Sequence, residues 1–346
     1  MSKSNRRVTL KEIAEVTGLH RTSVSRALRD HPGIPEETRI RVKKEAERLG
    51  YTQDPVLSAL SAYTRSYSQP KYQTTIGLLS NWDIQNSTNQ HHTFRSFIEG
   101  IQTRAKTLGF KTEHFSTLSF QKSPGRLSKI LQARNITPII VLPLKINHPS
   151  PILEWEQFMT VLVGFSFPKH ELDRVTHHHR SAIKLALTHA RQAGYRSFGL
   201  ITNAHIDQRT EHGYLSGFLE AKYLAPRKER FNLWISKSKR PDFSTLKNWI
   251  AKNKPDVIFS ANQDFIDVIN SVDLKIPEDV AFVQLDLPPN HNHVAGIRQN
   301  SEHVGKAAVD QVNSLYQANE KGLPNTAKTI QIEGDWVNGD TLPPKC

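Results

Sequence analysis

Cysteine and long apolar runs are almost absent from this sequence. The single cysteine, Cys346, cannot form an internal disulfide, so we expect a reducing compartment. No stretch approaches the roughly 18 consecutive apolar residues that a membrane-spanning helix needs. The opening residues MSKSNRR have no apolar segment behind their charges and do not form a secretory signal. We therefore expect a cytoplasmic protein with no membrane partner.

The usual motifs of metal and cofactor chemistry are also missing. The sequence contains no H-E-x-x-H, no G-x-G-x-x-G and no Walker loop, which would hold zinc or nucleotide phosphates. His177, His178 and His179 are consecutive, so we expect their rings to diverge rather than converge on one ion. Gly164-Phe-Ser166 is half of a nucleophile elbow and lacks the second glycine. We predict no catalytic residue, no metal and no cofactor.

Residues 9–28, TLKEIAEVTGLHRTSVSRAL, predict two short helices joined by a tight turn. Thr9 and Glu12 form a capping box, in which each side chain accepts a hydrogen bond from the backbone of the other residue. Gly18 can take the positive φ that a tight corner between helices needs. The second helix turns an apolar stripe inward, formed by Val24, Ala27 and Leu28.

A third helix is expected over residues 35–49, with Gly50 as its stop signal. Three helices around one small core form a helix-turn-helix module, which holds its second helix outward. The outward face of that helix is polar and basic. Such a face suits the major groove of DNA, because arginine can make two hydrogen bonds to guanine while serine and threonine bond bases or phosphates. The predicted DNA-binding residues of this module are Thr9, His20, Arg21, Thr22, Ser23, Ser25, Arg26 and Arg29.

Basic charge is concentrated in the same part of the chain. The formal net charge is +13, and residues 1–71 hold 14 Lys and Arg against eight Asp and Glu. Positive charge gathered on a DNA-binding module, here called the head, is typical of contact with phosphates. We therefore expect non-specific DNA affinity in the head and infer no function from the charge of the remaining chain.

The segment VTLKEIAEVTGLHRTSVSRALRDHPGIPEETRIRVKKEAERLGY resembles the N-terminal head of the lactose/galactose repressor family of bacterial transcription regulators. One departure is Pro35, which stands where the family commonly has a Ser or Thr cap. The resemblance implies a homodimer that binds double-stranded operator DNA. The matching residues are Val8-Thr9-Leu10, Ile13-Ala14, Gly18, Val24-Ser25-Arg26, Thr38-Arg39, Val42 and Leu49-Gly50-Tyr51.

The linker after the head begins with Asp54 and Pro55, which suit the N-cap and the first position of a helix. This helix would have only about eight residues, fewer than the roughly 12–15 that make an isolated helix stable, so it should form only when supported. The resemblance implies a hinge helix that forms on DNA, pairs with its twin and inserts Leu60 into the minor groove. Such a wedge kinks the duplex. The alternative is a linker whose leucines pack on the next domain.

From residue 74 onward, short apolar runs alternate with helical stretches, which predicts parallel α/β sheets. The resemblance continues there and implies a two-lobed sensor like the periplasmic binding proteins. We therefore expect an all-α headpiece followed by a two-lobed α/β domain. The later matches are Ser260-Ala-Asn262, Ile276-Pro-Glu-Asp-Val280, Asp286, Ile297-Arg298-Gln299-Asn300, Gly305 and Ala307. The expected organisation is a head over 1–53, a hinge and linker over 54–73, and an effector-binding and dimerisation domain over 74–346 with lobes at 74–174 plus 299–325 and at 175–298 plus 326–346.

Loops after the strands are where such sheets hold ligands, in the crevice between the lobes. Asp286 and Asn262 could bind paired sugar hydroxyls, and Phe94 and Tyr214 could stack on a ring. The chain departs from the sugar-binding members at three places, which indicates an unusual effector or a degenerate site. These departures are Tyr214 for arginine, Gln263 for aspartate, and His177-His178-His179 for an Asp-Asn pair. By alignment the effector candidates are His92, Phe94, Arg95, Tyr214, Asn262, Asp286 and Gln299.

These observations predict a sequence-specific DNA-binding transcription regulator, a repressor controlled by a small-molecule effector. The effector expected is a sugar or sugar derivative. One alternative is a constitutive DNA-binding regulator whose ligand crevice is degenerate. Another is an enzyme that uses the α/β lobes, although the sequence contains no complete catalytic set.

Overall fold

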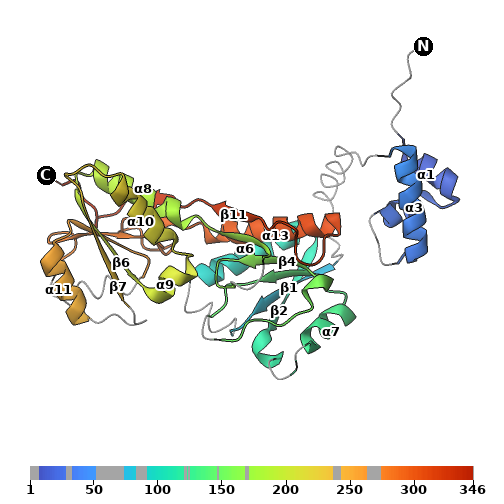
Figure 1. The fold of residues 1–346 in the computed structure, drawn as a ribbon, viewed down its shortest axis with the longest axis horizontal. Helices are drawn as coiled ribbons and strands as arrows, with labels where there is room; N and C mark the ends of the chain where they lie inside the picture. The colour runs from blue at the N-terminus through green and yellow to red at the C-terminus, as the bar shows by residue number, and fades with distance from the viewer. Residues whose placement is uncertain are drawn as a thin grey trace, which may run out of the picture.

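A computed structural model describes the chain over residues 8–28, 33–51, 74–82, 92–120, 123, 125–145, 148–167, 171–236, 243–262 and 274–345. These residues form a helical head and two α/β lobes, each built on a six-stranded sheet (Figure 1). The expected fold class is therefore confirmed. The hinge segment and its Leu60 lie outside the described residues.

The head begins with the capping box that the sequence predicts. Thr9 donates from its backbone N–H to Glu12 Oε2 at 2.6 Å, and its hydroxyl accepts from the Glu12 N–H at 3.4 Å. Gly18 ends the first helix with φ 67°, a left-handed conformation that a side chain would strain. Pro35 precedes the third helix without a side-chain cap, as its identity requires. The helices are α1 (Leu10–Thr17), α2 (Arg21–Leu28) and α3 (Glu36–Leu49).

A small apolar core holds these helices together. One face of each helix contributes to it, so that α1 and α3 support α2 from behind. The fully or almost fully buried members are Ile13, Val24, Ala27, Val42 and Ala46. This small core holds α2 in place through one face. The remaining residues of α2 are left to face solvent.

The first lobe has an all-parallel sheet in the order β11-β5-β4-β3-β1-β2. Helices α6 (His92–Leu108) and α13 (Ser301–Ala318) lie side by side on it, and α7 (Arg126–Ala133) packs with the opposite set of apolar residues. Two short 3-10 turns complete it, at Thr117–Phe120 and Trp155–Gln157. The strands are β1 (Thr74–Ser80), β2 (Phe110–Ser116), β3 (Pro138–Val141), β4 (Met159–Val163), β5 (Asp173–His177) and β11 (Thr329–Ile332).

The second lobe repeats this plan with the order β12-β10-β9-β8-β6-β7, in which only the pairing of β12 with β10 is antiparallel among the described strands. Its helices are α8 (His179–Gln192), α9 (Ala204–Arg209), α10 (Gly213–Tyr223) and α11 (Phe243–Asn253). Its strands are β6 (Ser197–Asn203), β7 (Arg230–Ser236), β8 (Val257–Ser260), β9 (Ala281–Gln284), β10 (Gly296–Arg298) and β12 (Asp335–Val337).

Two strands join a different sheet from the one that the expected lobe boundaries gave them. We expected the second lobe to begin at residue 175 and to include residues 326–346, but β5 and β11 both belong to the first sheet. Val175 pairs with Ile330, and β5 also pairs with β4. The apolar pattern of a short strand marks it as buried but carries no information on which sheet will accept its edge.

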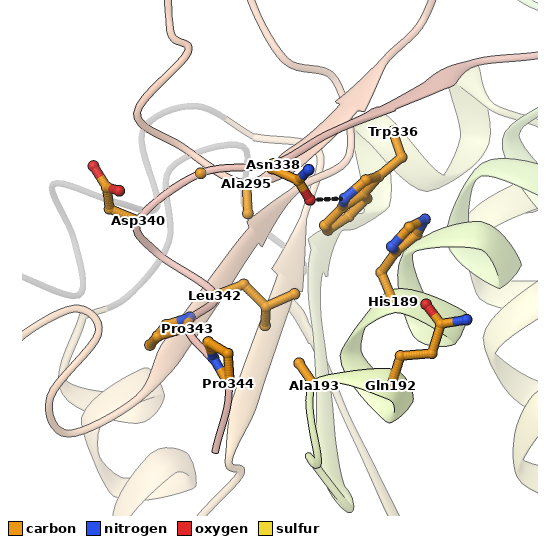
Figure 2. A pocket seen from close by; sticks show the side chains of 11 residues that line it. His189, Gln192, Ala193, Ala295, Trp336, Asn338, Asp340, Leu342, Pro343 and Pro344 are labelled. Carbon is orange, nitrogen blue, oxygen red and sulfur yellow. Dashed lines mark hydrogen bonds between the residues drawn. The ribbon is translucent and has the colours of Figure 1, made fainter. Parts of the chain in front are cut away.

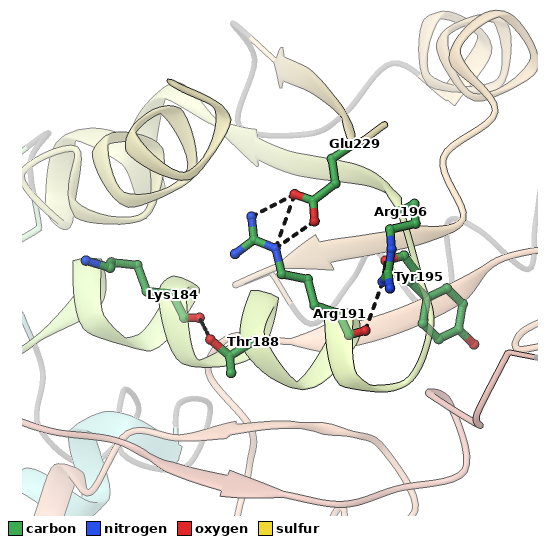
Figure 3. A network of polar contacts seen from close by, with 6 residues as sticks. All are labelled: Lys184, Thr188, Arg191, Tyr195, Arg196 and Glu229. Carbon is green, nitrogen blue, oxygen red and sulfur yellow. Dashed lines mark hydrogen bonds and ion pairs between the residues drawn. The ribbon is translucent and has the colours of Figure 1, made fainter. Parts of the chain in front are cut away.

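Ion pairing secures the end of α8 to the second sheet (Figure 3). Arg191, in the last turn of α8, binds both carboxylate oxygens of Glu229, with Nη2 at 2.9 Å from Oε2 and Nε at 3.1 Å from Oε1. The guanidinium also lies over the rings of Phe198 and Phe231, at 5.6 and 5.8 Å from their centroids. This pair therefore links helix and sheet at the point where β7 begins.

Candidate functional site

The outward face of α2 carries the residues that the sequence predicts for DNA contact. Arg21, Thr22 and Arg26 are exposed, Ser23 and Ser25 are half-buried, and the α2 sequence contains no acid. An exposed, basic and hydroxyl-rich helix face, held out by two other helices, fits the major groove in size and chemistry. Arg29 and Leu60, also predicted, lie outside the described residues.

Two other predicted DNA-binding residues have local structural roles. The Nδ1 atom of His20 lies 2.8 Å from the Thr22 hydroxyl and accepts from the Thr22 N–H at 3.4 Å, so His20 caps the start of α2. Thr9 is exposed at the start of α1, and its hydroxyl takes part in the capping box. Both residues therefore help to set the ends of the helices next to the reading face.

A second set of polar side chains gathers where the two lobes meet. The hydroxyl of Thr93, on α6 of the first lobe, donates to Asp286 Oδ2 of the second lobe at 3.1 Å. The guanidinium of Arg209, at the end of α9, lies over the ring of Phe94 at 5.4 Å from its centroid. We call the following residues the interlobe cluster: Thr93, Phe94, His177, His179, Arg209, Tyr214, Asp286 and Gln299.

A buried hydrogen-bond network forms the second-lobe side of the interlobe cluster. The Tyr214 hydroxyl donates to the Leu285 carbonyl at 3.1 Å, and Gln299 Nε2 donates to the Tyr214 oxygen at 2.8 Å and to the same carbonyl. Burial, helped by the charge of Asp286, raises the pKa of Tyr214 well above its ordinary value, so its hydroxyl stays protonated. Asp286 Oδ1 and Gln299 Oε1 are buried and accept no hydrogen bond from the described residues. Both atoms can accept from a ligand.

Two of the three consecutive histidines belong to this cluster. The ring of His177 stacks on Phe97 at 5.3 Å and meets the edge of His179, which in turn contacts Tyr214 at 4.9 Å. Burial lowers the pKa of His177 to about 4 and that of His179 well below its ordinary value, so both are neutral at pH 7. His178 is not part of the cluster, and its Nδ1 atom lies 2.6 Å from Oε1 of Glu333.

No metal arrangement accompanies these rings within the ranges that the structure describes. Groups of three or more His, Cys, Asp or Glu side chains able to hold an ion are absent there. Nor is any helix among the described residues long and apolar enough to cross a bilayer.

The structure brings four of the seven effector candidates together in the interlobe cluster, and a fifth, His92, lies near enough to His177 to lower its pKa. Phe94, Tyr214, Asp286 and Gln299 lie in the interlobe cluster, whereas Arg95 is exposed on α6, Asn262 is half-buried after β8, and His92 is half-buried at the first residue of α6. The ring of Phe94 stacks on Trp82 at 5.0 Å, so the expected stacking on a ligand is already provided from within the chain.

Sequence analysis missed four members of the cluster, which are Thr93, His177, His179 and Arg209. The histidines stood out only as a departure from the family pattern, and nothing local marked the other two. In the sequence, Arg209 at the end of a short helix looks like a surface arginine. Only the packing of the lobes places its guanidinium over the ring of Phe94.

A hollow of about 520 Å³ lies elsewhere, between α8 and the C-terminal segment (Figure 2). The ring of His189 stacks on Trp336 at 4.2 Å along one side of it. All of its lining residues come from the second lobe and its C-terminal segment, and none belongs to the interlobe cluster. A ligand there would therefore not sense directly how the two lobes stand to each other.

Comparison with known proteins finds relatives that span most of the chain. No family model matches the chain. The chain is similar to the probable HTH-type transcriptional repressor ExuR of Bacillus subtilis (strain 168), with 22% identity over 295 residues that cover 81% of each protein. It resembles the structure of the lac repressor dimer bound to operator and the anti-inducer ONPF, with a TM-score of 0.54, 17% identity, and coverage of 98% of this chain and 100% of that one. The complex of the transcriptional regulator CelR with cellobiose gives a TM-score of 0.57 at 16% identity, over 97% and 100% of the two chains.

The head, its exposed basic helix and these relatives define a helix-turn-helix DNA-binding transcription regulator. The two structures establish the fold, a head followed by two α/β lobes, and the curated relative is a regulator rather than an enzyme. The resemblance to the lactose/galactose repressor family, expected from the sequence, is thereby confirmed.

Proposed function

We propose that this regulator is a cytoplasmic repressor that binds a roughly palindromic operator as a homodimer. The observation that carries the proposal is the exposed face of α2, supported by α1 and α3. Two such heads related by a twofold axis would reach half-sites in successive major grooves on one side of the duplex. The lac repressor, a structural relative, is a dimer bound to operator.

Within each head, the side chains of α2 would read the bases. Arg21, Thr22, Ser25 and Arg26 would face the groove, while Thr9, His20 and Ser23 would bind phosphates or support the reading helix. The same role is proposed for Arg29, which lies outside the described residues. Leu60 of the hinge would wedge the minor groove and bend the site. This division predicts that loss of Arg26 changes base preference, whereas loss of a phosphate contact weakens all sequences alike.

The lobes would control this head through a sugar or sugar derivative bound at the interlobe cluster. Half-buried Asp286 and buried Gln299 each have a buried acceptor atom without a donor among the described residues, which suits hydroxyl groups. A relative of similar fold, CelR, binds cellobiose. A ligand that favours one arrangement of the lobes needs a coupling of only ~1–3 kcal/mol to change operator affinity by about 5- to 150-fold.

An operator-binding titration of Arg26→Ala tests the DNA-binding proposal. The duplex is first selected from random sequence by the full chain, and affinity is then measured by fluorescence anisotropy at fixed salt. We expect a loss of ~1–3 kcal/mol, roughly 5- to 150-fold, with a weaker preference at one base pair of each half-site. Lys44→Ala on α3 removes the same charge from another exposed surface of the head and should change affinity much less. Equal losses in the two variants would show that α2 is not the reading helix.

The same assay tests effector control and separates it from the alternative. If no sugar, sugar acid or sugar phosphate changes operator affinity, the chain is a constitutive DNA-binding regulator with a degenerate crevice. The relatives give no support to the enzyme alternative, since the curated one is a transcriptional repressor.

A further inference from the structure

Arg209 is a half-buried cation placed between the two lobes. It ends α9 in the second lobe, and its guanidinium lies over the ring of Phe94 at the start of α6 in the first lobe. Burial lowers its pKa, yet arginine keeps its charge in proteins at any physiological pH. A positive charge is therefore held where the lobes meet.

The guanidinium of Arg209 differs from those of the half-buried Arg191 and Arg174 in its partners. Arg191 binds the Glu229 carboxylate, and Arg174 donates to the carbonyls of Gly164 and Phe167. For Arg209 the contact found among the described residues is with an aromatic face, and no described acid or carbonyl accepts from it. A half-buried charge without a counter-ion is costly, so an anion from outside would stabilise it through the guanidinium N–H donors.

The same short segment also contacts Asp286, which has an unpaired acceptor atom. Thr93 binds one oxygen of Asp286, and the next residue, Phe94, lies under Arg209. The second Asp286 oxygen and Gln299 Oε1 are buried without donors among the described residues. The cluster thus contains both a cation and acceptors able to bind hydroxyl groups.

The start of α6 adds to the positive end of this arrangement. The helix runs from His92 to Leu108 and has no acid in its first turn, so its dipole favours negative charge beside residues 92–94. A single carboxylate matches the one guanidinium in charge and in its two-pronged geometry. A phosphate would bring more negative charge next to Asp286 than one guanidinium can compensate.

We propose that the effector is a sugar acid, whose carboxylate binds Arg209 while its hydroxyl groups donate to Asp286 and Gln299. This inference rests on the proposed function, because it names the ligand class of the effector site assumed there. It predicts that the regulator discriminates an acid from the neutral sugar of the same carbon skeleton.

Calorimetric titration of the full chain tests this discrimination. The probes are D-gluconate, D-glucuronate and D-galacturonate, with D-glucose and D-galactose as neutral counterparts and D-glucose 6-phosphate as the alternative anion. We expect at least one acid to bind at least about tenfold more tightly than its neutral counterpart, since a hydrogen bond to a charged group contributes on the order of a factor of ten or more. Preference for the phosphate over every acid would overturn the assignment of a carboxylate.

Substitution of the arginine tests the residue itself. Arg209→Gln should weaken binding of the preferred acid by roughly 10- to 100-fold and leave any binding of the neutral sugar unchanged. Arg209→Lys keeps the charge and should restore part of the affinity, because an ammonium lacks the two-pronged geometry. Arg180→Gln is the matched control, because it removes an exposed arginine of α8 that pairs with Glu220 of α10. This variant should bind the acid as the original chain does.

The outcomes separate this inference from the proposed function. Equal affinity for acids and neutral sugars, both lost in Asp286→Asn, would overturn the sugar-acid assignment and leave effector control standing. Undiminished acid binding by Arg209→Gln, with thermal unfolding unchanged, would also overturn it. If none of the probes binds or changes operator affinity, both the sugar-acid assignment and effector control are wrong, while DNA binding by α2 is judged separately from Arg26→Ala.

Discussion

At the scale of single residues, two glutamates that pair with arginine differ in how far their side chains are exposed to water. The Glu229 side chain is 6% exposed and binds Arg191 through both oxygens, whereas Glu220 is 28% exposed and shares its oxygens between Arg180 and Lys184. An exposed pair gains little because water and salt screen it. A buried carboxylate leaves its partner stranded when it is removed.

We therefore expect Glu229→Gln to lower the free energy of unfolding by roughly 1–3 kcal/mol. The amide can still accept from Arg191, but it no longer neutralises the guanidinium over Phe198 and Phe231. Urea unfolding of the full chain, followed by tryptophan fluorescence, measures the change. Glu220→Gln is the control and should leave the midpoint nearly unchanged; a larger effect in the control would mean that exposure does not rank these pairs.

Between elements, α6 lies beside α13 in the first lobe (Figure 1), and the two helix backbones approach each other closely at two glycines. A Cβ on Gly305 would collide with the Phe97 carbonyl, and one on Gly100 would collide with the Glu302 carbonyl. The two glycines let the helix backbones meet directly, and the neighbouring side chains of both helices bury into one core. The helix that returns from the second lobe is thereby fixed to the helix that bears Thr93 and Phe94.

Gly305→Val should destabilise the first lobe by ~3 kcal/mol or more, because the obstacle is backbone that cannot move without separating the helices. Hydrogen exchange of amides in α6 and α13, measured by mass spectrometry on the full chain, should show faster exchange in both helices. Ser314→Ala, on the exposed side of α13, is the control and should preserve the native protection pattern. Normal protection in Gly305→Val would contradict this account of the packing.

For the whole molecule, the residues where the lobes meet include two histidines that stay neutral at pH 7. His177 ends β5 of the first lobe, contacts Ser301 at 3.1 Å where the chain returns, and faces His179, His92 and Asp286. Its folded pKa of about 4 lies below the 6.5 of an unfolded chain. Between these two pH values His177 is protonated in the unfolded state but not in the folded state. The free energy of unfolding therefore falls as the pH decreases from 6.5 to 4.

This difference predicts a loss of about 2 kcal/mol of stability between pH 7 and pH 5 from His177 alone. Urea unfolding at a series of pH values gives the slope. His177→Asn removes one of the two buried histidines and should make the profile less steep in that window, while His179 keeps its own contribution. His303→Gln, an exposed histidine on α13, should keep the original slope. A profile equally steep in His177→Asn would show that another group controls acid sensitivity.

For the molecule as a whole, part of the fold was predictable from the sequence because it depends on residues that are close together along the chain. The head follows from a capping box, a glycine at a turn and apolar residues at helical spacing, all of which act within about four residues. The succession of strands and helices in the lobes was predictable for the same reason. Candidate residues on α2 could also be named, since helical periodicity alone separates the outward from the inward face.

What the sequence could not determine was which distant segments meet. The assignment of β5 and β11 to the first sheet depends on backbone pairing between residues far apart in the chain, and their apolar residues would suit either sheet. The same holds for Arg209 over Phe94 and for the neutral pair His177 and His179, which only the packed lobes withdraw from water. Local spacing thus determined the reading head, whereas the charge and burial of the interlobe cluster were decided by tertiary contacts, because desolvation is a property of the surroundings and not of the residue.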